Sequence, residues 1–156
     1  MRTLLSIVLL TALFATLGVA ADKPNFSGEW TADMTKSDFG PMGPPQAYSR
    51  KVDHAEPAIS YTEVQTGGPQ GDTTFTLKCT TDGKESDNDI AGNPVKLSSK
   101  WDGEALMMTG KLDFQGNEVT LADKWTLSSD GKVLTIARHI AMSQGEFDVT
   151  YILNKK

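Results

Sequence analysis

The chain has 156 residues, a net charge of −5 and an apolar content of 38%, with 14 glycines. This composition is typical of a folded globular protein, and the length suits a single hydrophobic core. An acidic chain without a cluster of basic residues is a poor partner for nucleic acid or for an anionic membrane surface, so we expect neither function.

The first 21 residues have the layout of a secretory signal. Residues 1–3 carry one positive charge, residues 4–17 are mainly apolar, and residues 18–21 are small, as cleavage requires. We predict removal of 1–21 and a single domain at 22–156, secreted or periplasmic and not stably inserted in a membrane. A retained anchor is the alternative, because the apolar run approaches the length of a membrane span.

Metal and thiol chemistry find little support in the sequence. Cys79 is the single cysteine, so no internal disulfide can form, and no basic residue is predicted beside it. His54 and His139 lack the spacing of metal ligands, and residues 87–92 begin like a calcium loop without its closing glutamate. We therefore predict Cys79 as a small core residue, and neither a metal nor a cofactor.

The first expected strand covers residues 25–34. Phe26, Gly28 and Trp30 fall on one face, and a glycine two residues before an inward Trp would make room beside the indole. Residues 35–47 contain three prolines and two glycines, which predicts a loop. Phe39 and Met42 in this loop either pack beneath it or form a flap over the mouth of a cavity.

The chain is organised around a hairpin at residues 118–141. Both arms alternate apolar and polar residues, which indicates strands with one buried face. Asp130-Gly131 between them predicts a two-residue type I′ turn, because that turn needs positive φ at both positions. Partners across this turn have residue numbers that sum to 261. Asp123 therefore faces Arg138 on the apolar side.

Alternation extends over most of the remaining chain. Strands are expected at 48–54 and 58–65, and further strands follow from Thr73 to Leu153 with turns at 82–83, 92–93, 102–103, 115–116 and 144–145. The implied facing pairs share one apolar face: Phe75 with Ile90, Leu97 with Met108, Met108 with Asp123, and Arg138 with Tyr151. About ten short antiparallel strands with one apolar face predict an all-β up-and-down barrel, since closure removes exposed edges.

Residues 26–30, Phe-Ser-Gly-Glu-Trp, resemble the Gly-x-Trp signature of lipocalins and their fatty-acid-binding relatives, the calycin group. With Lys-Ser-Asp-Phe-Gly at 36–40, the chain is similar to small secreted bacterial lipocalin-like proteins. The resemblance implies a barrel whose Trp lies at a closed floor, with an Arg from a late strand packed across it. Two features depart from it. The 35–47 loop is too rich in proline for a helical lid, and Arg138 lies higher in the barrel than such an Arg would.

The inward row of Asp123, Arg138 and Tyr151 is the main candidate site. A buried ion pair seldom adds net stability, so a second role is worth considering. The row is either a salt bridge that closes the barrel or an anchor, in which Arg138 and Tyr151 hold the polar head of a ligand. The remaining predicted ligand-binding residues are Phe75, Leu97, Met108, Leu121 and Ile140. The predicted floor residues are Trp30, Trp101 and Trp125.

These features predict an exported, monomeric protein that binds a small apolar or amphipathic ligand such as a lipid inside the barrel. Two alternatives remain open. One is a filled-core module of the envelope or extracellular space, whose rim loops bind a protein or a glycan. The other is a barrel enzyme that uses Asp123 as a general acid or base.

Overall fold

The computed structural model describes residues 23–68, 71–114 and 116–156, and the predicted signal segment lies outside them. The described chain forms ten strands and one short 3-10 helix. They are β1 Gly28–Ala32, η1 Gly40–Met42, β2 Ala47–Ala55, β3 Ala58–Gly68, β4 Gly71–Thr80, β5 Ser86–Ile90, β6 Asn93–Asp102, β7 Ala105–Phe114, β8 Asn117–Leu127, β9 Val133–Met142 and β10 Gly145–Lys155.

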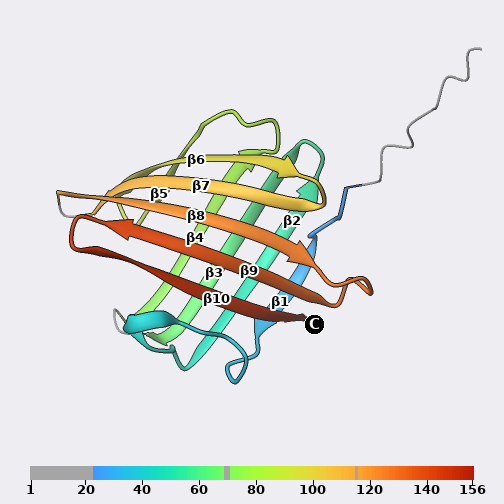
Figure 1. Ribbon diagram of the computed structural model, residues 1–156, viewed down its shortest axis with the longest axis horizontal. Helices are drawn as coiled ribbons and strands as arrows, with labels where there is room; N and C mark the ends of the chain where they lie inside the picture. The colour runs from blue at the N-terminus through green and yellow to red at the C-terminus, as the bar shows by residue number, and fades with distance from the viewer. Residues whose placement is uncertain (1–22, 69–70, 115) are drawn as a thin grey trace, which may run out of the picture.

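The strands form one antiparallel sheet in the order β4-β3-β2-β1-β10-β9-β8-β7-β6-β5. The first strand pairs with the last, through Trp30 and Lys155, so the sheet curls into a nearly closed barrel. Figure 1 shows β2–β4 crossing behind β6–β10, with η1 near the start of β10. The predicted all-β barrel of about ten strands is confirmed.

Closure is incomplete between β4 and β5, which are the two edges of the sheet. The predicted pairing of Phe75 with Ile90 is therefore wrong. The chain after β4 instead pairs with β6, where the Gly83 amide donates to the Ser99 carbonyl oxygen over 2.8 Å. Across the seam, the Asn88 side chain accepts a hydrogen bond from Lys78 N (2.8 Å) and donates one to Lys78 O (2.9 Å). The Asn88 side chain thus links β4 and β5, which lack the backbone hydrogen bonds of paired strands.

The central hairpins have the predicted register. Asp123 pairs with both Arg138 of β9 and Met108 of β7. The tip, however, is not a type I′ turn, because Ala91 is the one described residue other than glycine with positive φ. Residues 129–132 form a four-residue loop closed by a bond from Ser128 N to Val133 O. The register is unchanged because this loop has the same centre as the predicted two-residue turn.

Three other registers are shifted by two residues. Leu97 pairs with Gly110 rather than Met108, and Arg138 pairs with Val149 rather than Tyr151. The turns lie at residues 91–92, 103–104 and 143–144, each one residue from the predicted position. At the first of them, Ala91 and Gly92 both have positive φ, as a type I′ turn requires. A two-residue slip keeps every side chain on its face, so the inward set is unchanged.

The two ends of the barrel differ. The end formed by the β2–β3, β6–β7 and β8–β9 turns, to the right in Figure 1, is sealed by fully buried side chains. We call it the floor. The end formed by loop 35–47 and the β3–β4, β5–β6, β7–β8 and β9–β10 turns is the open end. Several inward residues there, such as Phe75, Ile90 and Leu112, are only half-buried. In the described part of the chain, no helix is long and apolar enough to cross a membrane.

Candidate functional site

Aromatic rings seal the floor. Phe26 stacks on Trp101, with ring centroids 5.8 Å apart, and meets Trp125 edge-on at 5.7 Å. Trp30 and Trp125 are completely buried, and Trp101 is partly exposed at the surface of this cluster. The three tryptophans predicted for the floor therefore all lie there.

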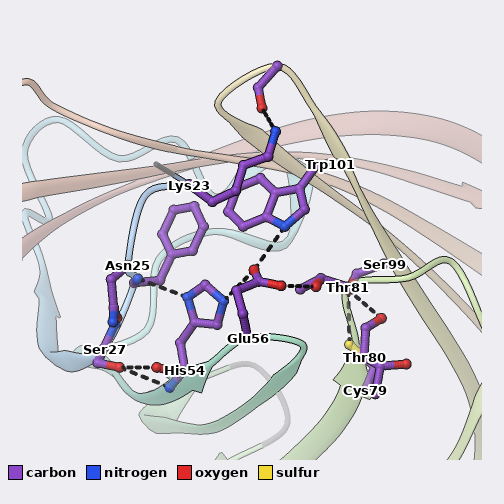
Figure 2. A network of polar contacts seen from close by, with 12 residues as sticks. Lys23, Asn25, Ser27, His54, Glu56, Cys79, Thr80, Thr81, Ser99 and Trp101 are labelled. Carbon is purple, nitrogen blue, oxygen red and sulfur yellow. Dashed lines mark hydrogen bonds and ion pairs between the residues drawn. The ribbon is translucent and has the colours of Figure 1, made fainter. Parts of the chain in front are cut away.

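A hydrogen-bond network around Glu56 joins the segments of the floor (Figure 2). Its carboxylate accepts bonds from Trp101 Nε1 (2.9 Å), Thr81 Oγ1 (2.5 Å) and His54 Nε2 (3.0 Å). His54 Nδ1 accepts a bond from Phe26 N (3.2 Å), so the ring proton lies on Nε2. Burial would raise the pKa of Glu56, but the bonds from Thr81, His54 and Trp101 outweigh burial and lower it. The partners are all satisfied, which favours a structural role.

Lys155 covers Trp30, its Nζ lying 5.3 Å from the ring centroid. The side chain that covers Trp30 is therefore a lysine from the last strand, where the calycin resemblance implies an arginine from a late strand. A Cβ at Gly28 would come within 2.8 Å of Lys155 Cε and 3.7 Å of Trp30 Nε1. Gly28 thus makes room for the lysine beside the indole, close to the role predicted for it.

A polar layer lies in the barrel interior, and Asp123 and Arg138 form one half of it. Arg138 donates from Nε to Asp123 Oδ1 (2.7 Å) and from Nη2 to Oδ2 (2.8 Å). Burial would raise the pKa of Asp123, but the guanidinium of Arg138 outweighs burial and lowers it. The guanidinium also lies 5.5 Å from the centroid of the Tyr151 ring, so the predicted row of three is brought together although Tyr151 is not the β-sheet partner of Arg138.

Sequence reasoning missed the other half, an ion pair between Arg50 of β2 and Glu63 of β3. Arg50 Nη2 also donates to Tyr48 Oη over 2.6 Å, and Glu63 Oε1 accepts a bond from Gln65 Nε2 over 3.0 Å. The sequence does contain a signal for this pair. A hairpin with its tip at Glu56-Pro57 has partners that sum to 113, which places Arg50 opposite Glu63 just as the later hairpin places Asp123 opposite Arg138.

Aromatic rings surround Arg50. Its guanidinium carbon lies 4.4 Å from the centroid of Tyr61 and 4.8 Å from that of Trp125. Two of its nitrogens, Nε and Nη1, are buried without a hydrogen-bond partner among the described residues. Burial would raise the pKa of Glu63, but the nearby arginines, Arg50 first, outweigh burial and lower it. The layer therefore holds two guanidinium groups and two carboxylates whose formal charges cancel.

The open end contains a cavity of about 420 Å³. Its apolar lining comes from loop 35–47 and from strands on both sides of the β4–β5 seam. The lining residues with large apolar or aromatic side chains are Phe39, Met42, Phe75, Ile90, Leu112, Phe114 and Tyr151. Phe39 and Tyr151 pack edge to face at 5.5 Å, and Tyr48 stacks on Tyr151 at 4.8 Å. Phe39 and Tyr151 thus form part of the cavity wall, and Tyr48 supports Tyr151.

Residues predicted to bind a ligand fall into three groups. Phe75 and Tyr151 line the cavity. The second group lies in the barrel interior outside the cavity lining. It contains Leu121, which is half-buried, and Leu97, Met108 and Ile140, which are buried in the core. Asp123 and Arg138 are bonded to each other and do not line the cavity. Anchoring of a ligand head group by Arg138 stays a prediction, which requires the head to reach the one guanidinium nitrogen, Nη1, that the pair leaves unused.

Loop 35–47 combines both roles that the sequence left open. Phe39 is buried, whereas the side chain of Met42 is 50% exposed, and both line the cavity. The short helix η1 lies beside β10, where a Cβ on Gly40 would come within 3.0 Å of Val149. The loop is thus pinned by Phe39 and presents Met42 at the mouth.

A larger hollow, of about 770 Å³, lies outside the barrel. Its lining includes the outward row of Asp53, Ser60 and Lys78, which pair across β2, β3 and β4. It is therefore a groove that opens on the outer surface, although buried His54 and Ile59 also border it. Cys79 borders it but is buried, its thiol donates to Ser99 Oγ over 3.3 Å, and burial raises its pKa. A protonated, hydrogen-bonded thiol is a poor nucleophile.

No protein-family model matches the sequence, and no curated protein matches it either. Solved structures do match. The ileal bile acid-binding protein of zebrafish, complexed with cholic acid, is 18% identical, with a TM-score of 0.56 over 84% of this chain and 98% of that one. The two chains share a calycin-like barrel fold.

Two further matches come from Ramazzottius varieornatus. A secretory abundant heat soluble protein is 10% identical, with a TM-score of 0.59 over 83% of this chain and 94% of that one. Secretory abundant heat soluble protein 4 is 13% identical, with a TM-score of 0.56 over 84% and 94%. The calycin-like fold is shared across these low identities. The resemblance to secreted bacterial proteins in particular stays a prediction.

Proposed function

We propose that this protein binds a small apolar or amphipathic molecule in the cavity at its open end. The observation that carries the proposal is the half-burial of Phe75, Ile90 and Leu112 around that cavity, while inward residues at the floor are sealed. Its volume of about 420 Å³ falls in the range of small-molecule sites. The cholic acid in the zebrafish structure shows that one barrel of this fold holds an amphipath.

The lining suits a molecule with an apolar body. Phe75, Ile90 and Leu112 offer apolar surface that a ligand would remove from water, at about 25 cal/mol for each Å². Gln65 and Asn93 supply amide groups to the same cavity. Burial raises the pKa of Tyr151, so its hydroxyl stays protonated. We further propose that the protein is exported, on the strength of the predicted signal at 1–21, and acts as a monomer.

Nile red, an uncharged dye whose emission increases in apolar sites, tests the proposal with the chain from residue 22 onward. We expect saturable binding with one site per chain. Leu112→Trp fills the cavity and should weaken binding about tenfold or more, whereas Thr109→Trp, on the exposed face of the same strand, should leave it unchanged.

Two results would count against the proposal. One is a lack of saturable Nile red binding, which would favour the filled-core module that binds through its rim. The other is equal binding by the two Trp variants, provided that circular dichroism shows both to be folded.

A further inference from the structure

We infer that the open-end cavity selects amphipaths with a cationic head group over those with an anionic one. The inference rests on the proposed function and names the class of its ligand: an apolar body bearing an amine or another cation. Two features of the structure support it, the charge of the cavity lining and the charge of the rim. The charge balance of the polar layer removes the main objection.

Among the described residues, one charged side chain lines the cavity, the carboxylate of Asp72. No described lysine, arginine or histidine takes part in the lining. Asp72 Oδ1 accepts a bond from Gly67 N over 2.8 Å, which positions the carboxylate at the mouth. Its second oxygen, Oδ2, lies outside this bond and could accept one from an ammonium group. The other polar lining residues, such as Gln65, Thr73 and Asn93, are uncharged.

The rim of the open end is also negatively charged. Each of the four hairpins at the open end has an acid within three residues of its turn: Asp72, Asp89, Asp113 and Glu146. Asp89 and Asp113 each accept a 2.7 Å bond from a turn glycine, Gly92 and Gly116, so their charges are held at the rim. A mouth surrounded by one sign of charge raises the local concentration of ions of the opposite sign.

The basic groups near the open end do not cancel the negative charge of the rim. Lys36 pairs with Asp33 over 3.0 Å, and Lys111 lines a separate hollow on the outer face. His139, on the outer face, faces Asp148 with Nδ1 (2.8 Å) and Glu146 with Nε2 (3.5 Å), so two acids offset the charge of a protonated ring.

The arginines of the interior do not supply a free cation either. Arg138 is bonded through two nitrogens to Asp123, and Arg50 is paired with Glu63. The unpartnered nitrogens of Arg50 are buried beside Tyr61 and Trp125, and Arg50 does not line the cavity. A carboxylate head group entering the mouth would therefore pass four acids and meet no unpaired base among the described lining residues.

Displacement of Nile red by decylamine and by decanoate, which share one chain length and differ in charge, tests the inference. Near neutral pH, at low salt and below the concentrations at which either forms micelles, we expect decylamine to bind about tenfold more tightly. The ratio should shrink at high salt, because the charges at the mouth are exposed. Asp72→Asn should reduce it several-fold. Asp102→Asn, which changes net charge equally at the floor, should leave it unchanged.

Equal affinities, or tighter binding of decanoate, would overturn the inference while leaving the cavity and its function intact. An equal effect of Asp72→Asn and Asp102→Asn would also overturn it, because selection would then reflect net charge alone. A failure of Nile red itself to bind would instead contradict the proposed function. The two failures are therefore distinguishable.

Discussion

The two ends of one strand, β7, show how this barrel divides its tasks. Leu106, near the floor, is fully buried, whereas Leu112, six residues further along on the same face, is half-buried and lines the cavity. The floor is packed with aromatic rings and tied by the Glu56 network, and the open end is lined but not filled. We therefore expect stability to be concentrated at the floor, which leaves the open end free to hold a cavity.

The polar layer separates the two regions. Asp123, Arg138, Arg50 and Glu63 are all buried, yet each ion is paired. Buried pairs of this kind add little net stability, but removing one partner strands a charge in the interior. We therefore expect the layer to fix the geometry below the cavity more than it stabilises the fold.

The largest effect is expected from breaking one of these pairs. Arg138→Ala leaves Asp123 buried without its partner and should lower the free energy of unfolding by about 3–5 kcal/mol. The double substitution Asp123→Leu with Arg138→Leu should recover most of that loss, because no charge is then stranded. Urea denaturation measures both. If Arg138→Ala were as stable as the double variant, the polar layer would have to be open to water.

A matched pair of leucines sharpens the comparison of the ends. Leu106→Ala should cost about 3 kcal/mol, because the buried floor cannot collapse around the space. Leu112→Ala should cost under about 1 kcal/mol, since its side chain already borders a cavity. The same denaturation assay applies to both. Similar losses for the two variants would mean that both ends are packed alike.

The smallest effect concerns the seam between β4 and β5. Asn88→Ala removes both bonds to the Lys78 backbone and should lower stability by about 1 kcal/mol. Hydrogen exchange at the Lys78 amide should accelerate, while exchange in the β8–β9 ladder stays unchanged. Unaltered exchange at Lys78 would show that something other than Asn88 holds the seam.

Alternation along the chain was enough to predict the barrel and its inward face. It also placed Asp123 opposite Arg138, because the centre of the turn at 130–131 sets that register whatever the type of turn. Leu97 and Arg138 were assigned wrong partners, since neighbouring positions for a turn fit the same pattern and a two-residue slip leaves the faces unchanged.

Other features depend on contacts that local pattern does not contain. The opening between β4 and β5 arises because Gly83 bonds to β6, a tertiary choice that an Asp-Gly pair does not reveal. The cavity depends on where Phe39 packs within an irregular loop. The Arg50–Glu63 pair, by contrast, could have been predicted from the turn at 56–57, because Tyr48, Arg50 and Val52 alternate as the later strands do.

The most direct test is an NMR titration of the chain from residue 22 with Nile red, following side-chain and backbone signals at both ends. We expect saturable shifts at Phe75, Ile90 and Leu112 and little change at Leu106 and Leu134. Shifts centred on the floor, or on the outer groove around Ser60 and Lys78, would contradict it.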